Sequence, residues 1–346
     1  MKIVVDTSLL NSEHKTRGIG RYTRQLVDSL RALGTEHKIV LTSKVDLVKH
    51  PDIVHYPNFD LFRKSLPWFP PAPVEVITIH DLTPLRMKDF FKPGLRSGLA
   101  LWIQSILVKR MKAVITDSEH SKSDIIEFLS IPPEKINVIP LGVDKEFKPV
   151  TANKIKSIKN KYSLPEKYLL YVGDVNPNKN LPVLLKVVAG LKMNLVIVSR
   201  AFERELLPEI INLRKIILDL GINHLVTVLS SIQMDPVDDL AAIYSGAFIY
   251  VQPSLYEGFG LPVLEAMACG VSVVSSNASS LPEVAGDAAL MVKSTEIGLR
   301  EGIKKLSFNE TMRKKLIQQG LARAKKFNWE KTAALTLKVY ERVAKV

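Results

Sequence analysis

Two glutamates, Glu257 and Glu265, flank the segment Gly-Phe-Gly-Leu-Pro-Val-Leu, which lies in the stretch that follows an apolar run at 248–251. The glycines allow close backbone approach, and Pro262 suits the first turn of a helix that begins near Gly260 or Leu261. Amides at a helix start bind anions, whereas carboxylates accept hydrogen bonds from vicinal hydroxyls. The segment therefore predicts a site for a sugar joined to a phosphorylated nucleoside. The alternative is a capped surface helix with acidic residues near its N-terminus.

A histidine and an aspartate, His80 and Asp81, follow the apolar run at 74–79. A lone histidine is more often structural, but a His-Asp pair at the carboxyl end of a strand favours chemistry, because ligands of open α/β sheets bind there. Asp81 is expected either to orient the ring of His80 or to meet an acceptor. The other candidates, His55, His120 and His224, show no metal-ligand spacing, and no metal site is expected.

The elements that position these residues are short apolar runs alternating with segments of helical spacing. Such alternation predicts an α/β protein with parallel, doubly wound sheets. The series pauses in a lysine-rich stretch between 142 and 165, which is expected to be an interdomain passage. We place the boundary near Val150, giving domains 1–150 and 151–346 that face each other across a cleft. The amphipathic helix 329–346 is a candidate to pack back on the first domain.

The pattern Glu-Gly-Phe-Gly-Leu-Pro-Val-Leu-Glu at 257–265 resembles the paired-glutamate signature of retaining family 4 glycosyltransferases, which have the GT-B fold with two Rossmann-like domains. The resemblance covers essentially the whole chain. Arg-Gly-Ile-Gly-Arg-Tyr at 17–22 is similar to the first glycine-rich loop of that family, and Thr-Ile-His-Asp-Leu at 78–82 is similar to its His-Asp segment. Similar pieces follow at 116–122 and 139–144. Each piece is weak alone, but their order is specific.

The resemblance assigns the donor-binding residues of the second domain. Glu265 would hold the ribose hydroxyls of a nucleoside-diphosphate sugar, and Glu257, as a catalytic residue, would contact the transferred sugar. Lys179, within Asn-Pro-Asn-Lys-Asn at 176–180, would face the diphosphate. The backbone amides that would support the sugar or the diphosphate are those of Gly258, Phe259, Gly260 and Leu261.

The resemblance also assigns residues of the first domain, which holds the acceptor in such enzymes. Gly18 would approach the diphosphate through its backbone, and His80 would contact the transferred sugar as a catalytic residue. Asp81 and Arg21 lie on the acceptor side. The implied reaction is same-face substitution without metal, in which the leaving diphosphate helps to take the acceptor proton; double displacement through Glu257 stays open.

One departure concerns the phosphate site, because many relatives carry arginine directly before the lysine, where this chain has Asn178. A second cation should then supplement Lys179 against about two negative charges on the diphosphate. Arg200, after the apolar run at 195–198, and Arg21 are candidates by position only.

The charge of the chain indicates an anionic partner, since 48 lysines and arginines against 35 aspartates and glutamates give a net charge of +13. Seven basic residues and several aromatic and aliphatic ones fall within 86–112, a composition that suits peripheral docking to an anionic membrane. The alternative is that Trp102 and the leucines face the core. No apolar run is long enough to span a bilayer, and the start of the chain suits a first strand, so a cytoplasmic location is expected, at most on the membrane face.

The His-Asp segment and the glycine-rich loop most resemble the mannosyltransferase-type branch of the family. The resemblance therefore implies a retaining hexosyltransferase acting on a nucleotide sugar, with GDP-mannose as the first donor choice and a UDP-hexose next. The acceptor would be a hydroxyl of a lipid-linked or polysaccharide glycan in cell-envelope synthesis. No cofactor beyond the donor and no nucleic acid is expected. The alternatives are a sugar-nucleotide epimerase of the same fold and a non-catalytic protein that binds nucleotide sugars or polyanions.

Overall fold

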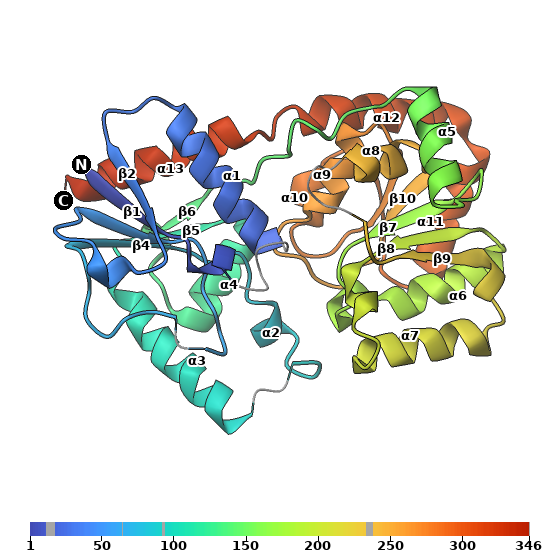
Figure 1. Ribbon diagram of the computed structural model, residues 1–346. Helices are drawn as coiled ribbons and strands as arrows, with labels where there is room; N and C mark the ends of the chain where they lie inside the picture. The colour runs from blue at the N-terminus through green and yellow to red at the C-terminus, as the bar shows by residue number, and fades with distance from the viewer. Residues whose placement is uncertain (12–17, 64, 92–93, 233–237, 346) are drawn as a thin grey trace. The chain divides into compact units, whose positions relative to one another are not determined.

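The computed structural model describes residues 1–346 except 12–17, 64, 92–93, 233–237 and 346. Arg17 of the first glycine-rich loop and Lys92 of the basic segment lie outside the described residues. The chain forms two compact units (Figure 1): unit 1 comprises 1–142 and 327–346, and unit 2 comprises 143–326. The division falls at Gly142, earlier than the boundary placed near Val150, and the C-terminal helix, a candidate to pack back on the first domain, belongs with unit 1.

Unit 1 is built on a six-stranded, all-parallel sheet with the strand order β2-β1-β3-β4-β5-β6. The strands are β1 (Lys2–Asp6), β2 (Lys38–Thr42), β3 (Ile53–Tyr56), β4 (Val74–Thr78), β5 (Ala113–Thr116) and β6 (Ile136–Val138). The helices are α1 (Gly18–Ala32), α2 (Thr83–Arg86), α3 (Leu95–Leu107), α4 (Glu119–Leu129) and α13 (Trp329–Ala344).

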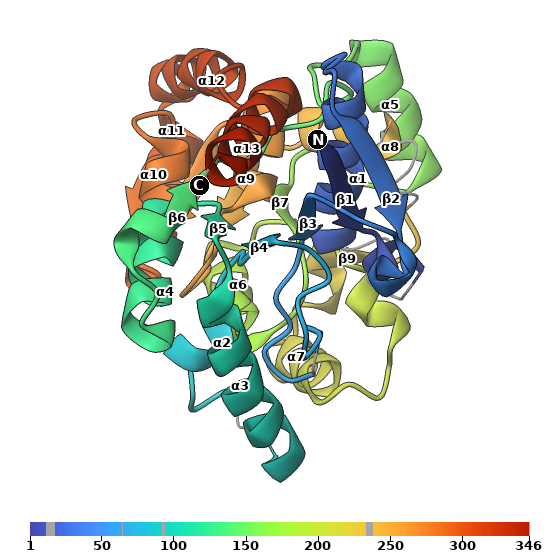
Figure 2. The ribbon, with the colours of Figure 1, turned by 90° about the vertical axis from the view of Figure 1, so that its left-hand side faces the viewer.

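The two faces of this sheet carry different helices. Val54 and Ile77 point to the face where Leu107, at the end of α3, and Ile125, on α4, complete a buried cluster. The opposite face is covered by α1 and α13, which pack against each other (Figure 2). Continuous apolar runs that are buried on both faces are typical of parallel sheets, and the runs in this chain follow that rule.

Unit 2 repeats this plan with the strand order β12-β11-β10-β7-β8-β9, again with every pair parallel. The strands are β7 (Leu169–Val172), β8 (Leu195–Val198), β9 (Val226–Leu229), β10 (Ile249–Gln252), β11 (Val273–Ser276) and β12 (Leu290–Val292). The helices are α5 (Ala152–Lys161), α6 (Leu181–Leu191), α7 (Pro208–Asp219), α8 (Asp238–Ser245), α9 (Leu261–Ala268), α10 (Leu281–Ala285), α11 (Glu296–Phe308) and α12 (Glu310–Ala324).

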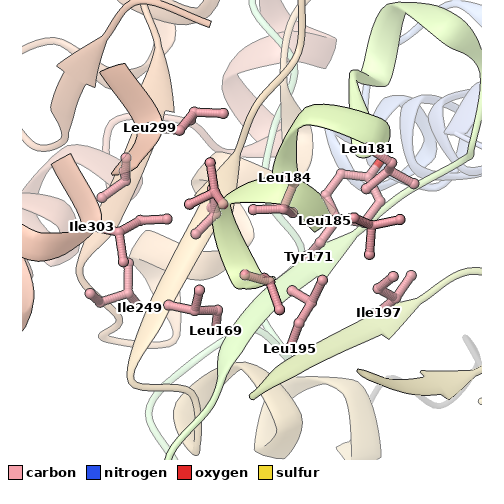
Figure 3. Packing of buried hydrophobic residues seen from close by; sticks show 14 of the residues in the cluster. Leu169, Tyr171, Leu181, Leu184, Leu185, Leu195, Ile197, Ile249, Leu299 and Ile303 are labelled. Carbon is pink, nitrogen blue, oxygen red and sulfur yellow. The ribbon is translucent and has the colours of Figure 1, made fainter. Parts of the chain in front are cut away.

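One face of the second sheet holds a large apolar core (Figure 3). Leu169, Leu195 and Ile249 of the central strands meet Leu184 of α6 and Ile303 of α11, all of them fully buried. The prediction of two doubly wound parallel α/β sheets is therefore confirmed. Helix α5 occupies much of the lysine-rich stretch that was expected to be a passage, and the side chain of Thr151 caps it by accepting from the amide of Lys154.

Helix α13 is fixed to unit 1 by contacts along its length. Gly142 passes so close to the start of the helix that a β-carbon would lie 2.3 Å from the amide nitrogen of Trp329. The hydroxyl of Thr332 donates to the carbonyl of Pro140 at 2.7 Å. Further along α13, the Tyr340 hydroxyl lies 2.6 Å from Nδ1 of His55 on β3.

Candidate functional site

The candidate site of unit 2 lies at the carboxyl edge of its sheet. Strands β8, β7, β10 and β11 are neighbours and run parallel, so the loops that follow them emerge at the same edge. The loop after β7 carries Lys179, the loop after β8 carries Arg200, and the loop after β10 carries Glu257. The topology therefore brings together residues that are far apart in the sequence.

A buried ion pair joins two of these loops. The Nζ atom of Lys179 donates to Oε1 of Glu257 at 2.8 Å and to Oε2 at 2.7 Å. The carboxylate also accepts from the Ser254 hydroxyl at 2.7 Å and from the Gln252 amide at 2.8 Å. The Lys179 side chain is 19% exposed and that of Glu257 is 9% exposed, so the charges are largely removed from water. The carboxylate is thus held in one orientation by three donors.

The backbone after Glu257 is shaped by two serines of the neighbouring loop. The amide of Glu257 donates to the Ser279 hydroxyl at 2.7 Å, and the Ser280 hydroxyl donates to the carbonyls of Glu257 and Phe259, both at 2.9 Å. Gly260 has φ of 109°, and a β-carbon there would lie 2.7 Å from Cδ2 of Leu281. Only glycine satisfies both conditions, which explains the glycine at position 260.

The second glutamate lies inside the helix that this loop begins. Gly260 is the N-cap of α9, Leu261 is its first residue and Pro262 lies in its first turn. Glu265 is one turn further on and is 3% exposed; its Oε2 accepts from the Tyr244 hydroxyl at 2.8 Å. Burial, together with this carboxylate, raises the pKa of Tyr244 well above its usual value, so the phenol stays protonated as a donor.

Arg200 and Arg21 were the candidates to supply the positive charge that an arginine at position 178 gives in many relatives. Asn178 is buried, and its amide donates to the carbonyl of Tyr256 at 3.0 Å, so this residue supports the loop that carries Glu257. Arg200 lies at the same sheet edge, but its guanidinium is half exposed and lies 3.9 Å from Glu203. Arg21 lies on α1 of unit 1. Among the described residues of unit 2, the ion pair of Arg200 is with Glu203 and not with Glu257.

The candidate site of unit 1 lies at the carboxyl edge of the first sheet. Nδ1 of His80, just after β4, lies 2.7 Å from Oδ2 of Asp117, just after β5, and Nε2 lies 3.2 Å from the carbonyl oxygen of Pro57, just after β3. The Tyr22 ring meets the imidazole edge-on at a centroid distance of 4.5 Å. Burial lowers the pKa of His80, but Asp117, with smaller contributions from Asp81 and the Pro57 carbonyl, raises it, and the net pKa is raised. The protonated ring can donate to both oxygens.

The ring partner of His80 differs from the sequence expectation. Asp81, which was expected either to orient the ring or to meet the acceptor, accepts from the amide of Thr83, the first residue of α2, at 2.8 Å. Asp117 takes the orienting position. It lies within the 116–122 segment, and the available signal was its place at the end of the strand next to β4, because neighbouring parallel strands end side by side.

Helix α1 brings the glycine-rich segment to this edge of unit 1. Gly18 is the first residue of α1 and is exposed, and a β-carbon there would meet nothing within 4 Å. Its backbone is therefore open to approach. Arg21 lies three residues further along the same helix and is partly exposed.

A buried hydrogen-bond chain, unforeseen from the sequence, lies beneath His80. The Thr78 hydroxyl lies 2.9 Å from the Tyr22 hydroxyl and 2.8 Å from Nε2 of His55, whose Nδ1 meets Tyr340 of α13. Burial, with the nearby charge of His80, lowers the pKa of His55 to about 3, so this imidazole is neutral. The chain links α1, β3, β4 and α13 and fixes the floor of the site.

The described part of the chain lacks the groupings that a metal site or a membrane-spanning helix would need. No group of three or more histidine, cysteine, aspartate or glutamate side chains is arranged there to hold a metal ion. No helix among the same residues has the length and apolar character needed to cross a membrane. Cys269 is buried, and burial raises the pKa of its thiol.

Comparison with known proteins places both units in one enzyme class. Residues 153–323 match "Glycosyl transferases group 1", and residues 42–147 match "Glycosyltransferase Family 4". The O-antigen chain mannosyltransferase B of Escherichia coli is 34% identical over 300 residues, which is 84% of this chain and 74% of that protein. The serotype-specific mannosyltransferase WbdA of Escherichia coli is 30% identical over 85% of this chain, but the chain spans only 37% of its length.

Solved structures agree on the fold. Sucrose-phosphate synthase from Thermosynechococcus elongatus superposes with a TM-score of 0.77 at 19% identity, covering 99% of each chain. Anabaena Alr3699/HepE, solved with UDP and glucose, gives the same TM-score at 15% identity over 100% of each chain. With two parallel α/β sheets and GT-B glycosyltransferases as neighbours, the architecture is GT-B. The chain belongs to the glycosyltransferases, with a family 4 domain in unit 1 and a group 1 domain in unit 2.

Proposed function

We propose that this glycosyltransferase is a retaining, metal-independent enzyme that transfers mannose from GDP-mannose to a hydroxyl of a lipid-linked or polysaccharide glycan. The mannosyltransferase relatives support the sugar, and the O-antigen chain enzyme among them supports a cell-envelope glycan as acceptor. The observation that carries the proposal is the Lys179–Glu257 pair, which shares a sheet edge with the start of α9 and with Glu265.

The donor would bind by exchanging partners at this pair. The ammonium of Lys179 neutralises Glu257. A diphosphate with about two negative charges competes for that ammonium, and the first-turn amides of α9 favour the same anion. Glu257 keeps the Ser254 and Gln252 donors and so stays oriented to accept from sugar hydroxyls. Glu265 would accept from the ribose hydroxyls.

In unit 1, His80 would contact the transferred sugar. Its Nε2 makes the longer of the two ring hydrogen bonds, 3.2 Å to the Pro57 carbonyl, whereas Asp117 holds Nδ1 at 2.7 Å. The weaker bond is the one that a sugar oxygen would replace, with the ring still held by Asp117. The backbone of Gly18 would approach the diphosphate, and Asp81 and Arg21 would lie toward the acceptor.

The proposed reaction forms the bond between acceptor oxygen and anomeric carbon on the face from which the diphosphate leaves. The bond from that carbon to the diphosphate oxygen breaks, and the acceptor proton passes to the leaving diphosphate. Lys179 and the amides at the start of α9 stabilise the charge that develops on the leaving group. Since these are fixed charges and dipoles of the chain, turnover should continue in EDTA.

Donor binding tests the proposal directly. Thermal unfolding is compared with GDP-mannose, UDP-glucose and ADP-glucose, because a ligand at a hundred times its Kd adds about 2.7 kcal/mol to stability. GDP-mannose should raise the Tm by several degrees in the wild type, and Glu265→Gln should abolish that shift while keeping an acceptor for Tyr244. Tyr244→Phe is the matched control and should retain it. An equal GDP-mannose response in Glu265→Gln would refute the ribose role, and free epimerised nucleotide sugar would refute transfer.

A further inference from the structure

Helix α3 exposes a continuous apolar stripe on its outer face. Leu95, Leu99, Trp102 and Ile106 are 97%, 59%, 62% and 51% exposed. Their spacing of four, three and four residues places them on one side of an α-helix, over a length of about 16 Å. Both views show α3 at the lower end of unit 1, with its N-terminal end projecting beyond the rest of that unit (Figures 1 and 2).

The opposite face of α3 is already used by the core of unit 1. Gln104 and Leu107 are buried, and Leu101 and Ile103 pack against the cluster that includes Ile77. A surface helix normally turns a polar face to water. Because α3 is apolar on both sides, its outer stripe is a hydrophobic surface exposed to water. A partner that binds this stripe would remove several large side chains from water.

A loop with two exposed aromatic residues is tied to the same helix. Trp68 is 57% exposed and Phe69 is 84% exposed. The Gln104 side chain accepts from the amide of Leu66 at 3.3 Å, and the Arg110 guanidinium, just after α3, donates to the carbonyl of Trp68 at 2.8 Å. These contacts hold the aromatic loop beside the C-terminal end of α3.

The charged residues around α3 indicate what kind of partner could cover the apolar stripe. Arg86 pairs with Asp124 and Glu127, and Arg110 pairs with Glu75 at 2.6 Å, so neither of these two cations is available to an outside partner. The remaining described cations of the segment are exposed, and α3 itself contains no acidic residue. They are Lys88, Arg96, Lys109 and Lys112. The stripe thus has exposed cations at both of its ends.

We propose that this surface, formed by the outer stripe of α3 and the Trp68–Phe69 loop, docks on an anionic lipid bilayer. Aliphatic and aromatic side chains flanked by lysine and arginine are what a helix lying in the interface requires, with its apolar side about 5–10 Å deep among the headgroups. A second copy fits poorly, because a two-fold pairing of α3 would bring Arg96 of one copy toward Lys109 of the other. This inference does not depend on the donor or on the reaction.

Intrinsic fluorescence offers a direct test, since the chain has three tryptophans and Trp329 is buried in unit 1. The two exposed ones, Trp68 and Trp102, both lie on the proposed surface. Adding the full-length protein to vesicles of phosphatidylglycerol and phosphatidylcholine should shift its emission to the blue, and brominated acyl chains should quench it. Vesicles of phosphatidylcholine alone should bind at least about tenfold more weakly.

Matched variants distinguish lipid binding through this surface from nonspecific binding through any exposed apolar residues. Leu99→Gln with Trp102→Gln should lower vesicle binding at least about tenfold in co-sedimentation. The control places the same changes on the exposed apolar residues Ile211 and Leu218 of α7 in unit 2, which are 54% and 64% exposed. That control should bind as the wild type does. Absence of binding to the anionic vesicles, equal loss in both double variants, or self-association through α3 without lipid binding would overturn the proposal.

Discussion

The ion pair between Lys179 and Glu257 can be tested by a double-mutant cycle on the free energy of unfolding. Lys179→Met leaves a carboxylate that is 9% exposed with donors from Ser254 and Gln252 only. Breaking a buried pair by removing one partner costs about 3–5 kcal/mol. Because Lys179 is 19% exposed and two donors remain, we expect about 2–4 kcal/mol for this variant.

The companion change, Glu257→Gln, leaves the Lys179 ammonium without its carboxylate partner. Because water reaches this ammonium more easily, the variant should lose only about 1–2 kcal/mol of unfolding free energy. The double variant should be more stable than the sum of the single changes implies, with a coupling energy of about 1–3 kcal/mol. Urea unfolding of the full chain gives the free energy of unfolding of the wild type, the two single variants and the double variant. The comparison requires that the dependence of this free energy on urea concentration, the m-value, is the same in all four. The matched control is the exposed pair of Lys314 and Glu310, 72% and 67% exposed, which should show no measurable coupling.

Strict additivity at Lys179 and Glu257 would refute the reasoning, since it would mean that the two charges do not interact in solution. The same proteins connect the pair to function. Lys179→Met should lower kcat/KM for the donor by about 10–150-fold, which corresponds to one charge-assisted hydrogen bond of about 1.5–3 kcal/mol. A loss of stability with unchanged donor kinetics would confine Lys179 to a structural role.

Three further predictions concern single positions. Gly260→Ala should cost about 1–3 kcal/mol in urea unfolding because φ is 109° and Leu281 blocks the β-carbon, whereas Gly98→Ala, with nothing within 4 Å, should be neutral or stabilising. His55, with its pKa lowered from 6.5 to about 3, contributes stability that is present above pH 6.5 and lost as the pH falls. About 2 kcal/mol should therefore disappear between pH 7.5 and 5, and His55→Gln should flatten that slope. Asp117→Asn should lower the pKa of His80 in an NMR titration, and Asp81→Asn should lower it less, because of the two carboxylates only Asp117 is hydrogen-bonded to the ring; equal shifts would contradict the ring assignment.

The strands and the α/β class followed from sequence because fully buried parallel strands require apolar runs, such as those of β7 and β8. Local chemistry also made the turn at Gly260 predictable, since a Gly-x-Gly-x-Pro spacing needs a helix start. The composition of unit 1 from two separate segments, 1–142 and 327–346, was harder to predict. The helix α13 returns to the first sheet through contacts such as Tyr340 with His55, which join residues that are hundreds of positions apart.

The sequence identified individual residues of the candidate sites, but it did not predict which of them contact each other. Lys179 and Glu257 each stood out within a local motif, but their mutual contact depends on β7 and β10 being neighbours. Asp117 was assigned no role because its partner His80 lies on another strand, and Asp81 was nearer in sequence. The orientation of Trp102 was also open, because a helix that is apolar all round has no periodicity to show which side faces water.

The measurement that tests the central claim most directly is the anomeric configuration of the sugar after transfer. The full-length protein is incubated with GDP-mannose carrying a ¹³C-labelled sugar and with lipid-linked and polysaccharide glycan acceptors, and the new linkage is observed by NMR. The account predicts release of GDP and a mannosyl linkage with the configuration of the donor, formed in EDTA and formed much more slowly by Lys179→Met. A linkage of inverted configuration, or an epimerised nucleotide sugar with no linkage formed, would contradict it.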